Sequence, residues 1–176
     1  MLLVLLGLLT LGGPAIFGAA PVISKEYQIK AAFLYNFTKF VQWPPERFAN
    51  ENSPIVIAVL GQNPFDDELD KLVRDRLVNG RAISVRYIET AADIPAAHIV
   101  FVAAGTETRL EAGLFGEPGV LTVGESADFA ARGGIIRFTL LDEKVRFEIN
   151  QGSAEKAGLK LSGQLLKLAT IIRKAP

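Results

Sequence analysis

Two short segments of this chain are apolar without interruption, and they constrain its fold more than any other feature. Residues 55–60 read IVIAVL between Pro54 and Gly61, and residues 99–103 read IVFVA directly after His98. A strand with one face in water alternates apolar and polar residues, whereas a strand buried on both faces does not. Both segments are therefore predicted to be central strands of a sheet that is covered on its two faces.

Helix and turn signals alternate with further strand signals along the rest of the chain. Predicted helices span residues 25–41, 63–74, 105–115, 126–131 and 163–174, with a short one from Ser153 that ends at Gly158. Predicted strands span residues 83–88, 120–123, 135–140 and 145–149, and the last two are spaced for a hairpin. This order predicts an α/β fold: a three-layer sandwich with a mainly parallel sheet, one antiparallel hairpin and helices on both faces.

The N-terminal segment has the features of an export signal. The first twenty residues carry no charge, and residues 2–11 read LLVLLGLLTL before Gly12-Gly13-Pro14. A helix that spans a bilayer needs about 20 apolar residues, so this run is too short. We interpret residues 1–20 as a signal peptide and residues 21–176 as a single domain that is exported to the periplasm. A buried N-terminal helix is the alternative, and the cleavage point stays open.

The predicted first helix, residues 25–41, is apolar on more than one face. A helix on the surface of a globular protein has an apolar stripe of about 100°. A helix with a wider apolar surface must be covered on two sides, either by its own domain or by another chain. We therefore expect a homodimer.

Composition argues against several classes of function. Lys plus Arg and Asp plus Glu each number 19, so the chain lacks the positive field that nucleic-acid binding requires. There is no cysteine, which removes disulfides, thiolate catalysis and cysteine-ligated zinc. His98 is the only histidine, and no serine lies in a G-x-S-x-G pattern, so we expect His98 to make a local hydrogen bond. No catalytic residue, metal site or cofactor is predicted, and the chain is not expected to be an enzyme.

One candidate ligand pocket lies at the carboxyl ends of the predicted strands, where open α/β sheets bind small molecules. It would involve Gly61, Asn63, Phe65 and Thr106. Neither the G-x-G-x-x-G pattern nor a P-loop is present, so a tight turn after the strand explains Gly61 equally well.

A polar surface is predicted on the last hairpin. In residues 144–150, KVRFEIN, the apolar side chains alternate with Lys144, Arg146, Glu148 and Asn150, and Arg137 of the preceding strand joins the same face. Cross-strand ion pairs on a solvated sheet face are one explanation, and each contributes little. A surface that recognises a partner is the other.

Several stretches, taken in order, resemble the YfiR family of periplasmic proteins. They are KAAFLYNFTKFVQWP from Lys30, IAVLG from Ile57 with Asn63-Pro64-Phe65, HIVF from His98, LTVG from Leu121, Phe129 with Gly133-Gly134, VRFEIN from Val145, and AGLKLS from Ala157 before Leu165-Leu166. The resemblance implies a periplasmic α/β protein without catalytic activity, often dimeric. Members of this family restrain a membrane-bound diguanylate cyclase by binding its periplasmic sensor region, and an OmpA-like outer-membrane lipoprotein sequesters them. Familiar members carry a cysteine where this chain has Ala97, so redox control is not expected here.

The function expected from this resemblance is inhibition of a transmembrane diguanylate cyclase, which lowers cyclic di-GMP and thereby controls biofilm formation and motility. The residues expected to contact the partner are Arg137, Arg146 and Glu148 on the sheet, with Gln164 and Lys167 on the last helix; Leu165, Leu168, Ala169 and Ile172 of that helix are expected in the core. The alternative is a periplasmic small-ligand-binding or sensor protein associated with a transporter or an outer-membrane receptor.

Overall fold

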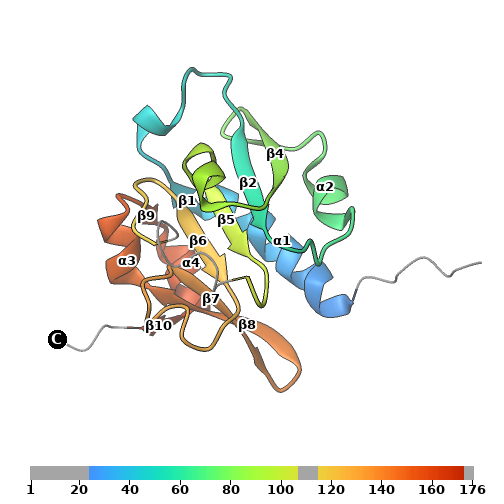
Figure 1. The fold of residues 1–176 in the computed structure, drawn as a ribbon. Coiled ribbons are helices and arrows are strands. Elements are labelled where there is room, and N and C mark those ends of the chain that lie inside the picture. Colours follow the sequence, from blue (N-terminus) through green and yellow to red (C-terminus); the bar gives the residue numbers. More distant parts are fainter. Residues whose placement is uncertain (1–23, 107–114, 173–176) are drawn as a thin grey trace, which may run out of the picture.

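An eight-stranded sheet forms the centre of the computed structural model, which describes residues 24–106 and 115–172 (Figure 1). Its strand order is β10-β8-β7-β6-β5-β2-β4-β3. The strands are β2 (Ile55–Leu60), β3 (Leu77–Val78), β4 (Arg81–Ile88), β5 (Ile99–Val102), β6 (Leu121–Gly124), β7 (Ile136–Leu141), β8 (Lys144–Asn150) and β10 (Thr170–Ile172). A separate antiparallel pair joins β1 (Val41–Gln42) to β9 (Lys160–Leu161).

The middle of the sheet is parallel, as predicted. Strands β4, β2, β5, β6 and β7 run in one direction, whereas β8 is antiparallel to β7 and β3 is antiparallel to β4. Every residue of β2 and of β5 is buried, which confirms that the two uninterrupted apolar segments are central strands. The predicted fold class is therefore confirmed.

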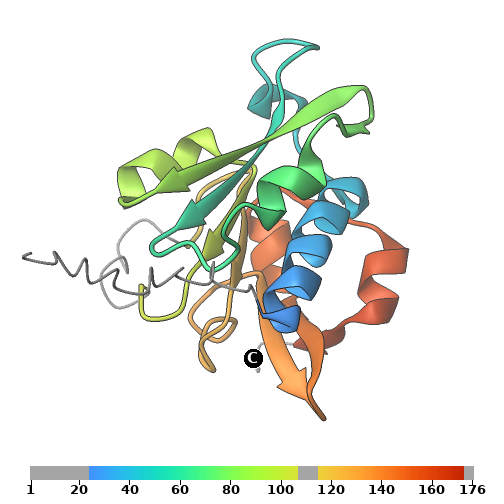
Figure 2. The same cartoon turned by 90° about the vertical axis from the view of Figure 1, so that its right-hand side faces the viewer.

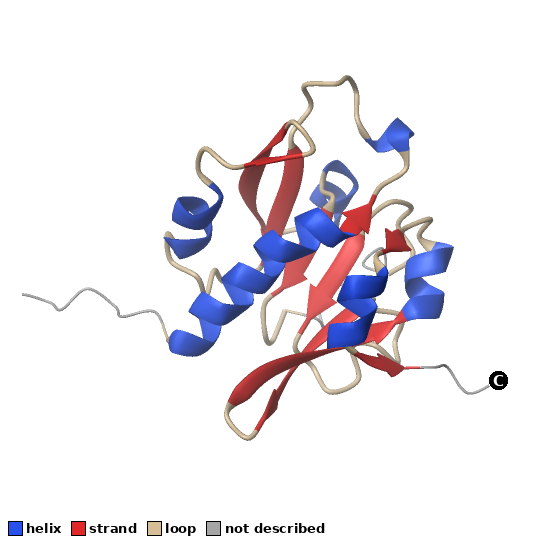
Figure 3. Cartoon of the chain, turned by 180° about the vertical axis from the view of Figure 1, so that it is seen from behind, coloured by secondary structure: helices blue, strands red, loops and turns tan. Residues whose placement is uncertain are grey.

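Different elements cover the two faces of the sheet. Three helices lie on one face: α1 (Lys25–Phe40), α2 (Glu68–Val73) and α4 (Gly163–Leu168) (Figure 3). The other face is covered by the 3-10 helix η2 (Ala91–Ala96), which lies across the sheet from α1 (Figure 2), and by the segment around Phe129. The short helices η1 (Pro45–Arg47) and α3 (Gln151–Lys156) follow β1 and β8.

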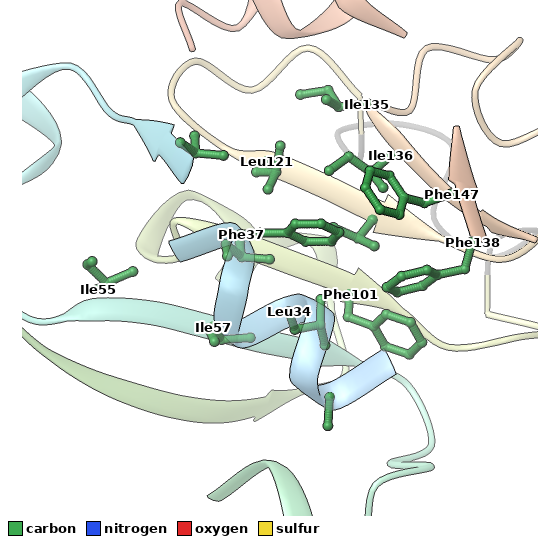
Figure 4. Close-up of a cluster of buried hydrophobic side chains, with 14 of the residues drawn as sticks. Leu34, Phe37, Ile55, Ile57, Phe101, Leu121, Ile135, Ile136, Phe138 and Phe147 are labelled. Carbon is green, nitrogen blue, oxygen red and sulfur yellow. The ribbon is translucent and has the colours of Figure 1, made fainter. Parts of the chain in front are cut away.

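Helix α1 anchors the larger core cluster. The Ser24 side chain caps its first turn by accepting a hydrogen bond from the Tyr27 N–H, and the chain becomes extended at Val41. Leu34 and Phe37 are fully buried against side chains of the sheet (Figure 4). The Phe37 ring centroid lies 5.4 Å from that of Phe147.

Most of the wide apolar surface of α1 is covered within the chain itself, although Ile29 is 36% exposed. Phe33 packs against the Phe147 ring at 5.2 Å, and both α2 and α4 contact the helix. This packing accounts for most of the apolar residues that motivated the expectation of a homodimer. The homodimer stays a prediction, but α1 no longer argues for it.

Two of the predicted helices differ in the structure. The helix predicted from Asn63 begins only at Glu68, because Asp66 has a left-handed backbone (φ 47°) and the Asn63 side chain accepts a hydrogen bond from the Phe65 N–H in a tight turn. The segment 126–131 forms consecutive turns instead of a helix. Its Phe129 ring lies against the Cα atoms of Gly124 and Gly134, and this burial fixes the segment in a non-helical path.

The prediction for the C-terminal segment is wrong in its second half. Helix α4 ends at Leu168, and residues 170–172 form the edge strand β10, parallel to β8. Thr170, Ile171 and Ile172 are β-branched and therefore favour a strand. Leu165 is buried as expected, whereas Leu168 is 66% exposed. The helix predicted for 105–115 falls almost entirely outside the described residues.

The β7–β8 hairpin closes with a strained turn. Asp142 and Glu143 have φ values of 50° and 59°, as a type I′ turn requires, although an Asn-Gly dipeptide is the sequence that favours such a turn. The double variant Asp142→Asn/Glu143→Gly, which installs that dipeptide, is expected to raise the free energy of unfolding by about 1 kcal/mol. Urea denaturation measures the change.

The β3–β4 turn offers the reciprocal control. Asn79-Gly80 already occupies that turn, with φ values of 51° and 79°. The exchange Asn79→Asp/Gly80→Glu is expected to lower the free energy of unfolding by a similar amount. If the two double variants changed the free energy of unfolding equally and in the same direction, this account would be contradicted.

Candidate functional site

The β7–β8 hairpin projects beyond the rest of the sheet and forms one wall of a corner (Figure 1). Strand β6 ends at Gly124, opposite Arg137, whereas β7 and β8 stay paired as far as Leu141 and Lys144. The start of α1 and the turn after β6 form the other walls. This corner holds a cavity of about 440 Å³ at the carboxyl end of the parallel strands, the edge where open α/β sheets bind their ligands.

A buried ion cluster lies in this corner. Lys30 of α1 is 4% exposed, and its Nζ donates hydrogen bonds to the carboxylates of Glu26 and Glu125. The Tyr27 hydroxyl donates to Glu125 Oε2 at 3.4 Å. Glu125 directly follows β6, so the cluster ties the helix to the edge of the sheet.

The environment of the cluster shifts the pKa of two groups. Burial alone would lower the pKa of Lys30, but hydrogen bonds to Glu125 and Glu26 outweigh that cost and raise it. Burial raises the pKa of Tyr27, and the negative charge of Glu125 adds to the effect. Lys30 is therefore a fixed positive charge and Tyr27 a neutral hydrogen-bond donor at neutral pH.

The sequence analysis missed this cluster. Two signals pointed to it: the i,i+4 spacing of Glu26 and Lys30 within an apolar helix, and the position of Glu125 directly after a strand. Neither signal indicates that the two segments meet, because Lys30 and Glu125 are 95 residues apart in sequence.

The polar face predicted on the hairpin is present. Val145, Phe147 and Ile149 point into the core, and the side chains between them point to the opposite face. Arg137 and Glu148 form a cross-strand ion pair with Nε and Oε2 2.7 Å apart. This pair matches the interpretation as a solvated sheet face.

Other polar side chains of the hairpin differ in their surroundings. Arg137 also donates through Nη1 to the Ala127 carbonyl at 2.8 Å, which fixes its guanidinium, whereas Arg146 is exposed. Asn150 departs from the pattern because it is buried, where its Nδ2 donates to the Ala130 carbonyl and its Oδ1 accepts from the Ser153 N–H. The accessible part of the polar face is therefore Lys144 and Arg146 with the half-buried Arg137–Glu148 pair.

The five predicted partner-contacting residues do not share one surface. Gln164 and Lys167 are exposed on α4, and α4 packs through Leu165 into the same core as Phe147. Arg146 lies on the other face of that sheet. The structure thus divides the prediction into two surfaces, one on each side of the molecule.

The four residues of the candidate ligand pocket are engaged in local packing. The Thr106 Oγ1 atom occupies the space that a Cβ on Gly61 would need, so Gly61 allows a close approach of the two loops. The Asn63 Nδ2 donates to the Asp66 carbonyl, and Phe65 is fully buried with its ring 4.9 Å from that of Phe101. Gly61, Asn63, Phe65 and Thr106 line neither the corner cavity beside Lys30 nor the cavity beside α3.

His98 makes the local hydrogen bond that the sequence predicts, in a fully enclosed position. It is 4% exposed, and its Nδ1 accepts a hydrogen bond from the Val56 N–H at 3.1 Å. Its ring stacks on Phe48 with centroids 4.6 Å apart and meets the Trp43 ring edge-on at 5.7 Å. Burial lowers the pKa of His98 to about 4, and the charges of Arg47 and Arg81 act in the same direction.

Residues 24–106 and 115–172 contain neither a metal-binding cluster nor a membrane-spanning helix. No group of three or more His, Cys, Asp or Glu side chains in these ranges is arranged to hold a metal ion. No helix within them is both long and apolar enough to cross a membrane.

Comparison with known proteins identifies a family. Residues 27–170 match the family described as YfiR/HmsC-like. No curated protein matches the chain. A solved structure of a conserved domain protein from Vibrio cholerae O1 biovar eltor is similar with a TM-score of 0.43 and 13% sequence identity; the match covers 68% of this chain and 55% of the other.

Proposed function

Because this chain belongs to the YfiR/HmsC-like family, we propose that it is an exported protein that binds the periplasmic sensor region of a transmembrane diguanylate cyclase and lowers cyclic di-GMP. Membership of this family supports a broader statement about the chain, namely a regulatory and non-catalytic role in diguanylate cyclase signalling. The family match covers Tyr27, Lys30 and Glu125 of the ion cluster and the whole of the projecting hairpin. To inhibit, the protein must bind the inactive state of the cyclase more tightly than the active state, since equal affinity for both states shifts nothing.

The observation that carries the proposal is the projecting β7–β8 hairpin. Its tip exposes Leu140 and Leu141, at 56% and 62%, and its polar face presents Arg146 beside the Arg137–Glu148 pair. Apolar side chains next to fixed charges are typical of surfaces that bind another protein. We propose this hairpin as the cyclase-binding surface.

The remaining expectations belong to the same proposal. Residues 1–20 would act as the signal peptide, and residues 21–176 as one periplasmic domain. A homodimer and sequestration by an OmpA-like outer-membrane lipoprotein would complete the signalling route. The alternative, a small-ligand-binding protein associated with a transporter or an outer-membrane receptor, predicts no effect on cyclic di-GMP.

Intracellular cyclic di-GMP in the native host tests the proposal. Deletion of the gene is expected to raise the nucleotide, and only a copy that retains residues 1–20 is expected to restore the low level. If deletion leaves cyclic di-GMP unchanged, the link to a cyclase is wrong and the alternative takes its place.

Two charge reversals decide which surface binds the cyclase. Arg146→Glu on the hairpin is expected to weaken repression at least tenfold, the scale of about 1.4 kcal/mol for a contact between charges at an interface. Lys167→Glu, which reverses another exposed cation, on α4, is expected to leave repression intact. The measurement is cyclic di-GMP in the complemented deletion strain at matched protein level. The opposite result would assign binding to α4.

A further inference from the structure

A second cavity lies where the central sheet splits. Strands β6 and β7 pair through only two pairs of residues, the last of which joins Gly124 to Arg137. One residue before this pairing begins, the Ile135 N–H donates to the Thr122 hydroxyl at 3.0 Å instead of to a carbonyl of β6. The strands diverge there, and helix α3 lines the space of about 400 Å³ that opens between them.

The interior of this cavity is apolar. Val120, Ile135 and Ala157 line it, and each is at most 4% exposed. Phe115 forms a wall, and its ring is held edge-on against Phe129 with centroids 5.3 Å apart. An apolar body placed there would lose its contact with water, which favours binding in proportion to the area buried.

The polar part of the lining carries positive charge. Lys156 is exposed on α3, and Arg132 lies across from it with its guanidinium 5.8 Å from the Phe115 ring centroid. Asp128 pairs with Arg132 at 3.6 Å but does not line the cavity. Among the described residues that line it, Arg132 and Lys156 are the charged ones, and none is a carboxylate. Because Asp128 already offsets the charge of Arg132, the cation that favours an anion beside the apolar floor is Lys156.

We propose that this cavity binds a small organic anion, a carboxylate, sulfonate or phosphate attached to an apolar ring-sized body. Its volume lies within the range of about 300–1,000 Å³ that is typical of small-molecule sites. The anion would lie beside Lys156, and the ring would contact Phe115 and Ile135. This site is separate from the hairpin that is proposed to bind the cyclase, so either proposal can fail without the other.

A matched pair of fluorescent probes tests the need for an anion. 8-Anilinonaphthalene-1-sulfonate and N-phenyl-1-naphthylamine share one apolar body, but only the first carries a sulfonate. The sulfonate probe is expected to bind at one saturable site at least tenfold more tightly than the neutral probe, because attraction between the sulfonate and Lys156 adds to the burial of the shared apolar body and is weakened by salt. Fluorescence titration measures both dissociation constants.

Charge reversals locate the site. Lys156→Glu is expected to raise the dissociation constant of the sulfonate probe about tenfold, for the electrostatic reason given above. Lys160→Glu, which reverses another exposed lysine, on β9 outside the cavity, is expected to change it less than twofold. Equal effects of the two reversals would overturn the proposal, because the probe would then be bound elsewhere, for example at the exposed Leu140 and Leu141.

Occlusion of the cavity provides an independent test. A Cβ atom on Gly152, which lines the cavity, meets nothing closer than 3.6 Å and leaves the backbone unstrained, so Gly152→Phe is expected to place its ring in the cavity and block it. Gly163→Phe in the first turn of α4, where nothing lies within 4 Å, is the control. The amide signals of Thr122, Ile135 and Ala157 are expected to shift in heteronuclear NMR spectra when the sulfonate probe is added. Binding that survives Gly152→Phe, or the absence of saturable binding, would overturn the proposal.

Discussion

Replacing Lys30 by methionine is expected to lower the free energy of unfolding by about 3 kcal/mol at pH 7, since removing one partner leaves a buried charge uncompensated. Methionine retains the apolar stem, so the loss comes from the ammonium group. Lys30 and Glu125 have side-chain exposures of 5% and 12%, and Glu26 completes the cluster. Without the ammonium group, two carboxylates that it now bridges would face each other at the corner of the sheet. Chemical denaturation measures the loss.

Lys71 offers a matched control on the surface. It pairs with Asp67 at the same i,i+4 spacing and with Glu68, but its side chain is 53% exposed. Lys71→Met is expected to cost less than about 0.5 kcal/mol, because water screens an exposed ion pair. Equal losses for the two lysine variants would show that burial does not govern the α1 cluster.

The partner of Lys30 provides the second comparison. Glu125→Gln removes one of the two carboxylate charges and retains an acceptor for the Tyr27 hydroxyl. In the Lys30→Met background, this change is expected to recover more than half of the lost stability. Losses that simply add in the double variant would contradict a direct interaction between Lys30 and Glu125.

Local sequence patterns predicted the elements whose environment is the same along their whole length. Strand β2 is buried on both faces, so its apolar run could not be mistaken for an amphipathic one. Helix α1 has a capping serine at one end and Trp43-Pro44 just beyond the other, and its predicted bounds differ by a single residue from those observed. In both cases the physical cause of the structure is within the segment itself.

The differences arise where tertiary contacts decide the local structure. Residues 163–174 carry a helix signal at their start, but Thr170 to Ile172 gain a parallel partner in β8 and become a strand. Turns replace the helix at 126–131 because the Phe129 ring is buried between two glycines that no local pattern connects with it. The edge of a sheet and a pocket for a ring are properties of the folded chain.

The same distinction applies to the candidate site: its local contacts were predictable from the sequence, and its long-range contacts were not. The Arg137–Glu148 pair follows from the register of an antiparallel hairpin, and the sequence indicated both residues. The placement of Lys167 on the opposite face depends on how α4 packs through Leu165, which the sequence pattern alone does not determine. The Lys30–Glu125 contact depends on the whole βα topology between them.

Stability is expected to fall in mild acid because His98 is held neutral in the folded protein. Its pKa is about 4 in the fold against an ordinary value of 6.5, so the unfolded chain binds the proton more readily. The stabilisation is complete above pH 6.5, declines as the pH falls from 6.5 towards 4, and is lost below. Between about pH 7 and pH 5 the contribution of His98 is expected to decrease by about 2 kcal/mol.

The geometry around His98 explains why protonation is unfavourable. Its Nδ1 accepts the Val56 N–H, and a proton on that nitrogen would break the bond and place two donors face to face. The guanidinium groups of Arg47 and Arg81 repel a positive imidazolium, and Phe48 excludes water from one face of the ring. Each of these contacts favours the neutral form.

The variant His98→Asn separates this titration from that of the carboxylates. Its Oδ1 can accept from the Val56 N–H, but the asparagine does not titrate. The variant is expected to be less stable than the parent at pH 7, because it loses the stacking on Phe48, and to lose about 2 kcal/mol less than the parent between pH 7 and pH 5. Urea denaturation at half-unit steps of pH measures both curves. Parallel curves would show that His98 does not carry the acid sensitivity, and that its burial costs the charged form far less than the contacts imply.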